Sequence, residues 1–131
     1  FGRFLISRIW SRSMAKKSLE DMVFDGSSIT DEEIDRMWDF SIYPGNMDAM
    51  FQEFRETWAA FDPADIKEIT TNTLLIWGKE DSICPESMGI WYDSHLPNST
   101  MVVIPNIGHN PHFECPNRCS DEISSWLAAL T

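Results

Sequence analysis

Two short apolar runs constrain the fold of this chain more than any other feature. Residues 73–77 read TLLIW and residues 100–104 read TMVVI, so each run is apolar or β-branched throughout. Continuous runs of this length are typical of strands that are buried on both faces of a sheet. The segments at 86–96 and 117–130 have helical patterns. Strand, helix, strand, helix with short loops predicts a βαβα unit whose two strands are parallel.

The first half of the chain has a helical pattern instead. We expect a helix over residues 4–18, and another directly after Thr30, because Thr30 and Glu33 have the spacing of a capping box. Residues 43–46 (YPGN) predict a turn after that helix. In the last helix of the chain, one face is expected to be buried; it consists of Ile123, Trp126, Leu127 and Leu130.

A stripe of methionine and aromatic residues follows the predicted turn at helical spacing. It consists of Met47, Met50, Phe51, Phe54, Trp58 and Phe61. Two interpretations stay open at this point. The stripe lines a substrate pocket, or it only packs against neighbouring helices, which is the commoner role of such residues.

Two polar residues follow the two predicted strands closely. Asp81 lies four residues beyond Trp77, and His109 lies five residues beyond Ile104. Because the carboxyl ends of parallel strands open at one edge of a sheet, these two side chains are expected to meet there. A carboxylate beside an imidazole is the acid and base pair of a nucleophilic triad, in which the histidine takes up and returns the proton of the nucleophile.

The residues around Asp81 and His109 resemble the C-terminal part of α/β-hydrolase-fold enzymes. "WGKEDSICP" matches the family pattern W-G-x-x-D-x-x-x-P, and "GHNPHFECP" matches G-H-x-x-H-x-E-x-P. The resemblance implies that Asp81 is the triad acid and His109 the triad base. The accompanying motif positions are Pro85, Gly108, His112, Glu114 and Pro116.

The resemblance extends to most of the chain. Residues 29–51 look like part of the helical cap that such enzymes insert before the strand of the acid. It therefore implies an α/β fold with two regions: a helical cap or lid at residues 1–68, and a C-terminal α/β core segment at residues 69–131 that carries the acid and histidine loops.

Alternative roles compete for the same loops. Glu80 is a rival for the acid position, but it lies one residue too early for the motif. His109, His112, Cys115 and Cys119 together suggest a zinc site, yet they span only eleven residues and two prolines interrupt them. We therefore expect no metal and no cofactor. His112 is expected to support the loop, and the three cysteines are expected to be small buried or helix-start residues.

The nucleophile of a triad is missing from the sequence. In this family it precedes the acid in a G-x-S-x-G pentapeptide, and no pair of the six glycines brackets a serine, cysteine or aspartate in that pattern. The chain is therefore expected to be part of a longer α/β-hydrolase, incomplete on its own. Its partner would be the N-terminal part of the same enzyme or another copy of this chain. The alternative is a truncated, non-catalytic module that binds a partner or a lipid through the methionine and aromatic stripe.

Composition narrows the remaining choices. The net charge of −11 argues against a nucleic-acid surface, which needs clustered lysine and arginine. No apolar run approaches the length of about 18 residues that spans a membrane. Three cysteines without a signal peptide favour a reducing, cytoplasmic compartment. The expected substrate is a small, apolar, ester-like molecule, and whether serine, cysteine or aspartate attacks it is left open.

Overall fold

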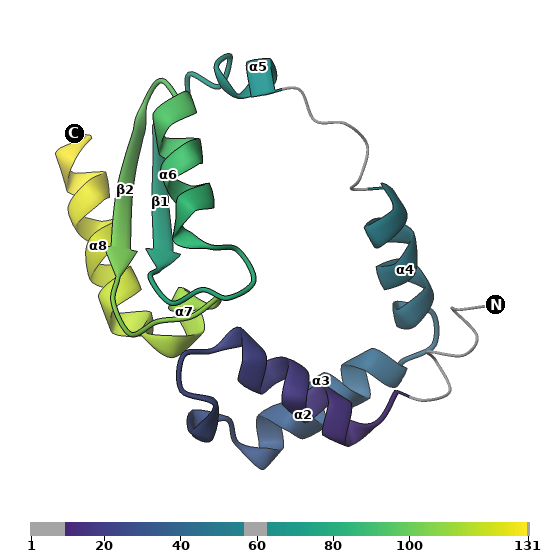
Figure 1. The fold of residues 1–131 in the computed structure, drawn as a ribbon. Coiled ribbons are helices and arrows are strands. Elements are labelled where there is room, and N and C mark those ends of the chain that lie inside the picture. Colours follow the sequence, from purple (N-terminus) through teal and green to yellow (C-terminus); the bar gives the residue numbers. More distant parts are fainter. Residues whose placement is uncertain (1–9, 57–62, 131) are drawn as a thin grey trace. The chain divides into compact units, whose positions relative to one another are not determined.

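The computed structural model describes residues 10–56 and 63–130, which form two compact units (Figure 1). Residues 10–20 and 26–56 belong to the first unit. Residues 21–25 and 63–130 belong to the second, so a short early segment of the chain packs with the C-terminal part. The predicted division into a cap at 1–68 and a core at 69–131 stays a prediction.

The first unit consists of helices. They are α2 (Arg12–Met22), whose last two residues already belong to the second unit, the short 3-10 helix η1 (Gly26–Ser28), α3 (Asp31–Ile42) and α4 (Asn46–Glu56). The helix predicted at 4–18 is described from Arg12 onward and extends to Met22; residues 4–9 lie outside the described residues. The predicted turn at 43–46 is present, with Gly45 at a φ of 93°.

The capping box that the sequence predicts is present at the start of α3. The Thr30 hydroxyl accepts a hydrogen bond from Glu33 N, and the Glu33 carboxylate accepts one from Thr30 N at 2.7 Å. These reciprocal bonds satisfy backbone N–H groups that have no partner inside a helix. They lower the pKa of the Glu33 carboxyl, the bond from the Thr30 backbone most of all.

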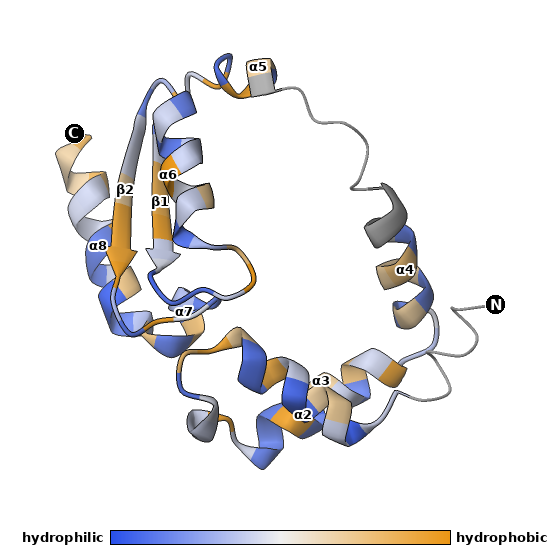
Figure 2. Ribbon diagram, viewed as in Figure 1, coloured by the Kyte–Doolittle hydropathy of each residue, from blue (hydrophilic) through white to orange (hydrophobic). Residues whose placement is uncertain are grey.

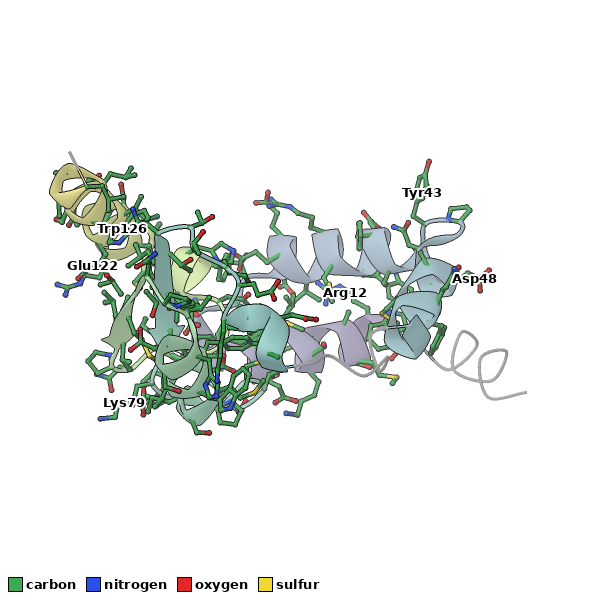
Figure 3. The ribbon with its side chains drawn as sticks, turned by 90° about the horizontal axis from the view of Figure 1, so that it is seen from above. Arg12, Tyr43, Asp48, Lys79, Glu122 and Trp126 are labelled. Atoms are coloured by element: carbon green, nitrogen blue, oxygen red, sulfur yellow. The ribbon has the colours of Figure 1, made fainter. Side chains whose placement is uncertain are left out.

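The interior of the first unit is small. Ala15 on α2 and Ile34 on α3 are completely or almost completely buried. On its surface, the Arg12 guanidinium, labelled in Figure 3, reaches from α2 to the carboxylates of Asp31 and Asp35 on α3. Because these ion pairs are exposed, each contributes little to stability.

The methionine and aromatic stripe is described only in part. Met47 and Phe51 are half-buried, and Met50 is 38% exposed. The side chains of Phe54, Trp58 and Phe61 lie outside the described residues. The two interpretations of the stripe, pocket lining and packing, both remain predictions.

The second unit contains the predicted βαβα unit. Its elements are α5 (Pro63–Ile66), β1 (Thr73–Gly78), α6 (Glu86–His95), β2 (Ser99–Ile104), α7 (Pro111–Glu114) and α8 (Pro116–Ala129). The loop predicted after β2 is therefore interrupted by the short helix α7, which Pro111 begins. Proline favours the first turn of a helix because the missing N–H has no partner there. No helix within residues 10–56 and 63–130 is both long and apolar enough to span a membrane.

The two strands are parallel neighbours, as predicted. The register runs from Thr73 opposite Ser99 to Gly78 opposite Ile104. Helices α6 and α8 lie against opposite faces of this sheet (Figures 1 and 3). The side chains of Trp77 and Met101 pack against α6 at Gly89. The glycine leaves room for them, because a Cβ at this position would lie 2.6 Å from the end of the Met101 side chain.

The prediction that both strands are buried on both faces is wrong for this chain. Of their residues only Gly78 and Ile104 are buried, although Figure 2 shows hydrophobic residues in the middle of β1 and toward the end of β2. The predicted buried face of α8 is also largely exposed: Ile123, Leu127 and Leu130 are 44%, 52% and 47% exposed. The physical reason is that, within the described residues, the sheet has only two strands, and one helix on each face cannot cover it.

Candidate functional site

The loop after β1 holds the Asp81 carboxylate in place. Its Oδ1 accepts hydrogen bonds from Ile83 N at 2.9 Å and from Cys84 N at 2.8 Å. The Trp77 indole donates to Cys84 O at 2.8 Å and so connects the loop to the end of the strand. The Asp81 side chain is only 5% exposed. The two backbone hydrogen bonds therefore fix the orientation of the carboxylate, and solvent has little access to its second oxygen.

That second oxygen contacts His109. The His109 Nδ1 donates to Asp81 Oδ2 at 2.9 Å, so the structure brings together the two residues that the sequence pairs. Because a carboxylate only accepts hydrogen bonds, this contact places the proton of a neutral imidazole on Nδ1. The Nε2 atom is then left with a lone pair. The His109 side chain is 32% exposed, so it is accessible from solvent.

The protonation of Asp81 follows from its surroundings. Burial by itself would raise the pKa of this carboxyl, since the interior disfavours charge. The hydrogen bonds from Cys84 N, His109 and Ile83 N outweigh burial and lower the pKa below its ordinary value. Asp81 is thus an anion at neutral pH.

Two glycines allow the strand end and the histidine loop to approach each other. A Cβ at Gly78 would lie 2.0 Å from Gly108 O, and a Cβ at Gly108 would lie 2.8 Å from the backbone of Val23 and Phe24. Both distances are far inside van der Waals contact. The motif glycines therefore serve close backbone packing between three segments of the chain.

Glu80 is not beside the imidazole. Its carboxylate accepts a hydrogen bond from Ile107 N at 3.2 Å, and its own N–H donates to Ile107 O at 3.0 Å. Glu80 thus connects the two loops, while Asp81 contacts His109. The choice of Asp81 over Glu80 as the triad acid stays a prediction.

Residues 21–25 are a part of the site that the sequence does not indicate. Met22 O accepts a hydrogen bond from His109 N at 2.8 Å, and Asp21 O accepts one from Ser82 Oγ at 3.2 Å. Glu114, predicted only as a motif position, accepts hydrogen bonds from Phe24 N and Gly108 N. The motif spacing was the available signal for Glu114. For residues 21–25 there was none, because they contribute backbone groups that every residue has.

The four residues of the zinc alternative are not arranged as a metal site. His112 is exposed on α7, and His109 Nδ1 is occupied by Asp81. The Cys115 and Cys119 sulfurs are 4.0 Å apart, and Cys119 is buried. Burial and the adjacent Cys115 thiol raise the pKa of Cys119 to about 11, which disfavours the thiolate that binds metals. Within the described residues, no group of three or more histidine, cysteine, aspartate or glutamate side chains is placed to hold an ion.

The sequence also matches a known protein family. A family model described as the alpha/beta hydrolase fold matches residues 2–116 of the sequence. The chain therefore belongs to the α/β-hydrolase family.

Individual relatives are hydrolases. The chain is 31% identical over 126 residues to the uncharacterized hydrolase YugF of Bacillus subtilis, covering 93% of this chain and 45% of the relative. It is 27% identical over 119 residues to a 2-hydroxymuconate semialdehyde hydrolase of Pseudomonas putida, covering 86% of this chain and 42% of the relative. The chain thus spans about half the length of these curated relatives.

A solved structure agrees with the fold. A meta-cleavage product hydrolase from Pseudomonas fluorescens superimposes with a TM-score of 0.80 at 26% identity. The match covers 92% of this chain and 47% of that structure. This chain therefore corresponds to about half of that structure.

Proposed function

We propose that this chain supplies the acid and the base of an α/β-hydrolase triad, Asp81 and His109. The observation that carries the proposal is the hydrogen bond from His109 Nδ1 to the buried Asp81 carboxylate. It leaves Nε2 as the base, and the anion of Asp81 stabilises the imidazolium that forms. The proximity of both residues to the carboxyl ends of the strands supports the assignment, since sites of α/β proteins lie there.

The nucleophile lies outside these 131 residues in this proposal. Two facts support it: no G-x-S-x-G pentapeptide is present, and the chain spans about half the length of its relatives. The nucleophile attacks a substrate carbonyl, and His109 Nε2 accepts the proton of the nucleophile. His109 then passes this proton to the leaving group. Water then releases the acyl group by the same route in reverse. The N-terminal part of the same enzyme, or another copy of the chain, would supply the attacking atom.

The substrate we propose is a small, apolar, ester-like carbonyl compound. Two relatives carry narrower names, a 2-hydroxymuconate semialdehyde hydrolase and a meta-cleavage product hydrolase. A meta-cleavage product is therefore the second substrate to assay beside a simple ester. Either substrate presents a carbonyl to the nucleophile, so the roles of Asp81 and His109 are the same.

The experiment compares substitutions in the longer enzyme that contains this sequence. His109→Ala should reduce kcat for a simple ester by about 10⁴-fold while the fold is retained, because the general base is lost. His95→Ala is the matched control and should leave kcat nearly unchanged, since the His95 imidazole binds Trp91 O within α6. Residues 1–131 alone should show no turnover. Ester turnover by residues 1–131 that His109→Ala abolishes would refute the external nucleophile.

A non-catalytic binding module is the second candidate. It is favoured by aromatic residues that the first unit exposes: Phe40 and Tyr43 are each 67% exposed, and Figure 3 shows Tyr43 pointing away from the helices. Such a module would bind a lipid surface or a partner whether or not His109 is intact. Flotation of residues 1–131 with phospholipid vesicles, lost in Phe40→Ser with Tyr43→Ser, would favour this candidate over the hydrolase.

A further inference from the structure

The carboxylate of Glu114 is bound by backbone N–H groups from two distant segments. Its Oε1 accepts from Gly108 N at 2.9 Å and from Asn110 N at 3.3 Å. Its Oε2 accepts from Phe24 N at 2.7 Å and, at 3.0 Å, shares the Gly108 N–H. Both oxygens of one half-buried side chain are therefore used, and three different N–H groups depend on it.

These N–H groups flank the imidazole-bearing residue. Gly108 and Asn110 are the immediate neighbours of His109, and His109 N itself donates to Met22 O at 2.8 Å. All three successive N–H groups of the turn are thus bound, two by Glu114 and one by the segment at 21–25. Hydrogen bonds to a carboxylate are stronger than neutral ones, so Glu114 holds this turn more firmly than a neutral acceptor would.

We propose that Glu114 is a positioning residue, which holds the backbone of His109 so that Nδ1 points at Asp81. An effect of Glu114 on catalysis rests on the proposed function, but its effect on the orientation of the His109 imidazole does not. Glu114 does not contact His109 or Asp81 side chains through any hydrogen bond in the described residues, so it acts through the turn. It also fixes residues 22–24 beside that turn through Phe24 N.

A change of one atom should disrupt this arrangement. In Glu114→Gln the side chain keeps its size, but one oxygen becomes an NH₂ donor. Whichever way the amide is turned, the NH₂ faces at least one backbone N–H, because each oxygen of Glu114 accepts from two of them. Two donors cannot bond to each other, so the turn at 108–110 or the segment at 22–24 must shift.

The first measurement needs no catalysis. In ¹H–¹⁵N NMR of the longer enzyme that contains this sequence, the His109 Nδ1–H proton should be observed as a slowly exchanging, downfield signal, since it is bound to a carboxylate. Glu114→Gln should remove this signal while the strand amides of β1 and β2 keep their chemical shifts. Glu122→Gln is the matched control: it removes the same charge from α8, where Glu122 pairs with Arg118 instead. It should leave the signal intact.

A second variant guards against loss of folding. Glu114→Asp keeps the charge, but its shorter side chain cannot reach both Phe24 N and the turn. If Glu114→Gln unfolds, the folded Glu114→Asp variant is measured in its place. A weakened His109 Nδ1–H signal in this variant supports the positioning role, and an unchanged signal overturns it. An unchanged signal in folded Glu114→Gln overturns it as well.

Kinetics in the longer enzyme separate this inference from the proposed function. Glu114→Gln should lower kcat about 100-fold with little change in KM, because a displacement of about 1 Å of a catalytic group has an effect of this size. If the NMR signal is lost in Glu114→Gln but His109→Ala leaves hydrolysis unchanged, the proposed function fails and the positioning role survives. If His109→Ala abolishes hydrolysis and Glu114→Gln is as active as the parent, Glu114 has no positioning role.

Discussion

The backbones of Gly78 and Gly108 are in direct contact, so close that a Cβ on Gly78 would lie 2.0 Å from Gly108 O. This contact joins the end of β1, from which the Asp81 loop departs, to the loop that carries His109. The distance between the two loops is therefore set by backbone atoms, which cannot yield as a flexible side chain can.

Gly78→Ala is expected to destabilise the second unit by about 3 kcal/mol, the upper end of the cost of overpacking an interior. It should also separate Asp81 from His109. Urea unfolding followed by the NMR signals of the strand amides measures the stability change. The control is Gly26→Ala, whose Cβ would have its nearest neighbour, the Glu20 Cβ, 3.1 Å away. A Gly78→Ala change as mild as that of Gly26→Ala would contradict the close contact.

Asp81 should give the second unit an acid-dependent stability. Because the pKa of Asp81 is lowered from its ordinary value of 3.8, the ionised form favours the folded state. This contribution is fully present above that value and is lost as the pH falls through the lower pKa of the folded state. Denaturation curves at neutral pH and below about pH 4 should therefore show a loss of stability in acid.

Asp81→Asn tests the origin of this effect and the tautomer of His109. Asparagine cannot ionise, so the variant should be less stable than the parent at neutral pH, with a smaller further loss in acid. Its amide would donate to His109 Nδ1 and shift the proton to Nε2, which ¹⁵N NMR distinguishes. If Asp81→Asn leaves both the loss of stability in acid and the His109 tautomer unchanged, the 2.9 Å hydrogen bond between His109 Nδ1 and Asp81 Oδ2 determines neither of them.

The capping box makes a prediction for the first unit. Thr30→Ala removes the hydroxyl that accepts from Glu33 N and should cost about 1 kcal/mol of stability. Hydrogen exchange of the first turn of α3 measures the local loss, since helix ends open before the whole unit does. Thr30→Ser, which keeps the oxygen, is the control and should restore most of the protection. Equal exchange in Thr30→Ala and the parent would show that the cap contributes nothing.

The free edge of β1 is the basis of the last prediction. In the described residues β1 pairs with β2 alone. Two strands are seldom stable by themselves, and an unpaired apolar edge recruits other strands. We expect this edge to pair with a second polypeptide, either the N-terminal part of the same enzyme or another copy of the chain. Size-exclusion chromatography with light scattering should then show a dimer or a larger assembly of residues 1–131. A cooperatively folded monomer would speak against this pairing and for a self-sufficient module.

Much of the local structure was predictable because it depends on neighbours along the chain. Thr30 and Glu33 are three residues apart, so the cap of α3 follows from spacing alone. The two apolar runs predicted β1 and β2 to within one residue at each end, and the helix between them placed the strands in parallel. The exposure of Ile123 and Leu127 was not predictable. An apolar stripe indicates that a helix face is suited to burial, but it does not indicate which other element covers that face.

The order of the elements in the second unit, and the positions of Asp81 and His109 directly after two parallel strands, follow from the order of residue types along the chain. How these two residues are held depends on contacts between segments that are far apart in the chain. Met22 O binds His109 N, Gly78 touches Gly108, and Glu114 collects N–H groups from residues that lie up to 90 positions away in the chain. The physical reason is that these contacts are made by backbone atoms, or to them. Backbone atoms are the same in every residue, so no pattern of side chains along the chain reveals which of them will meet.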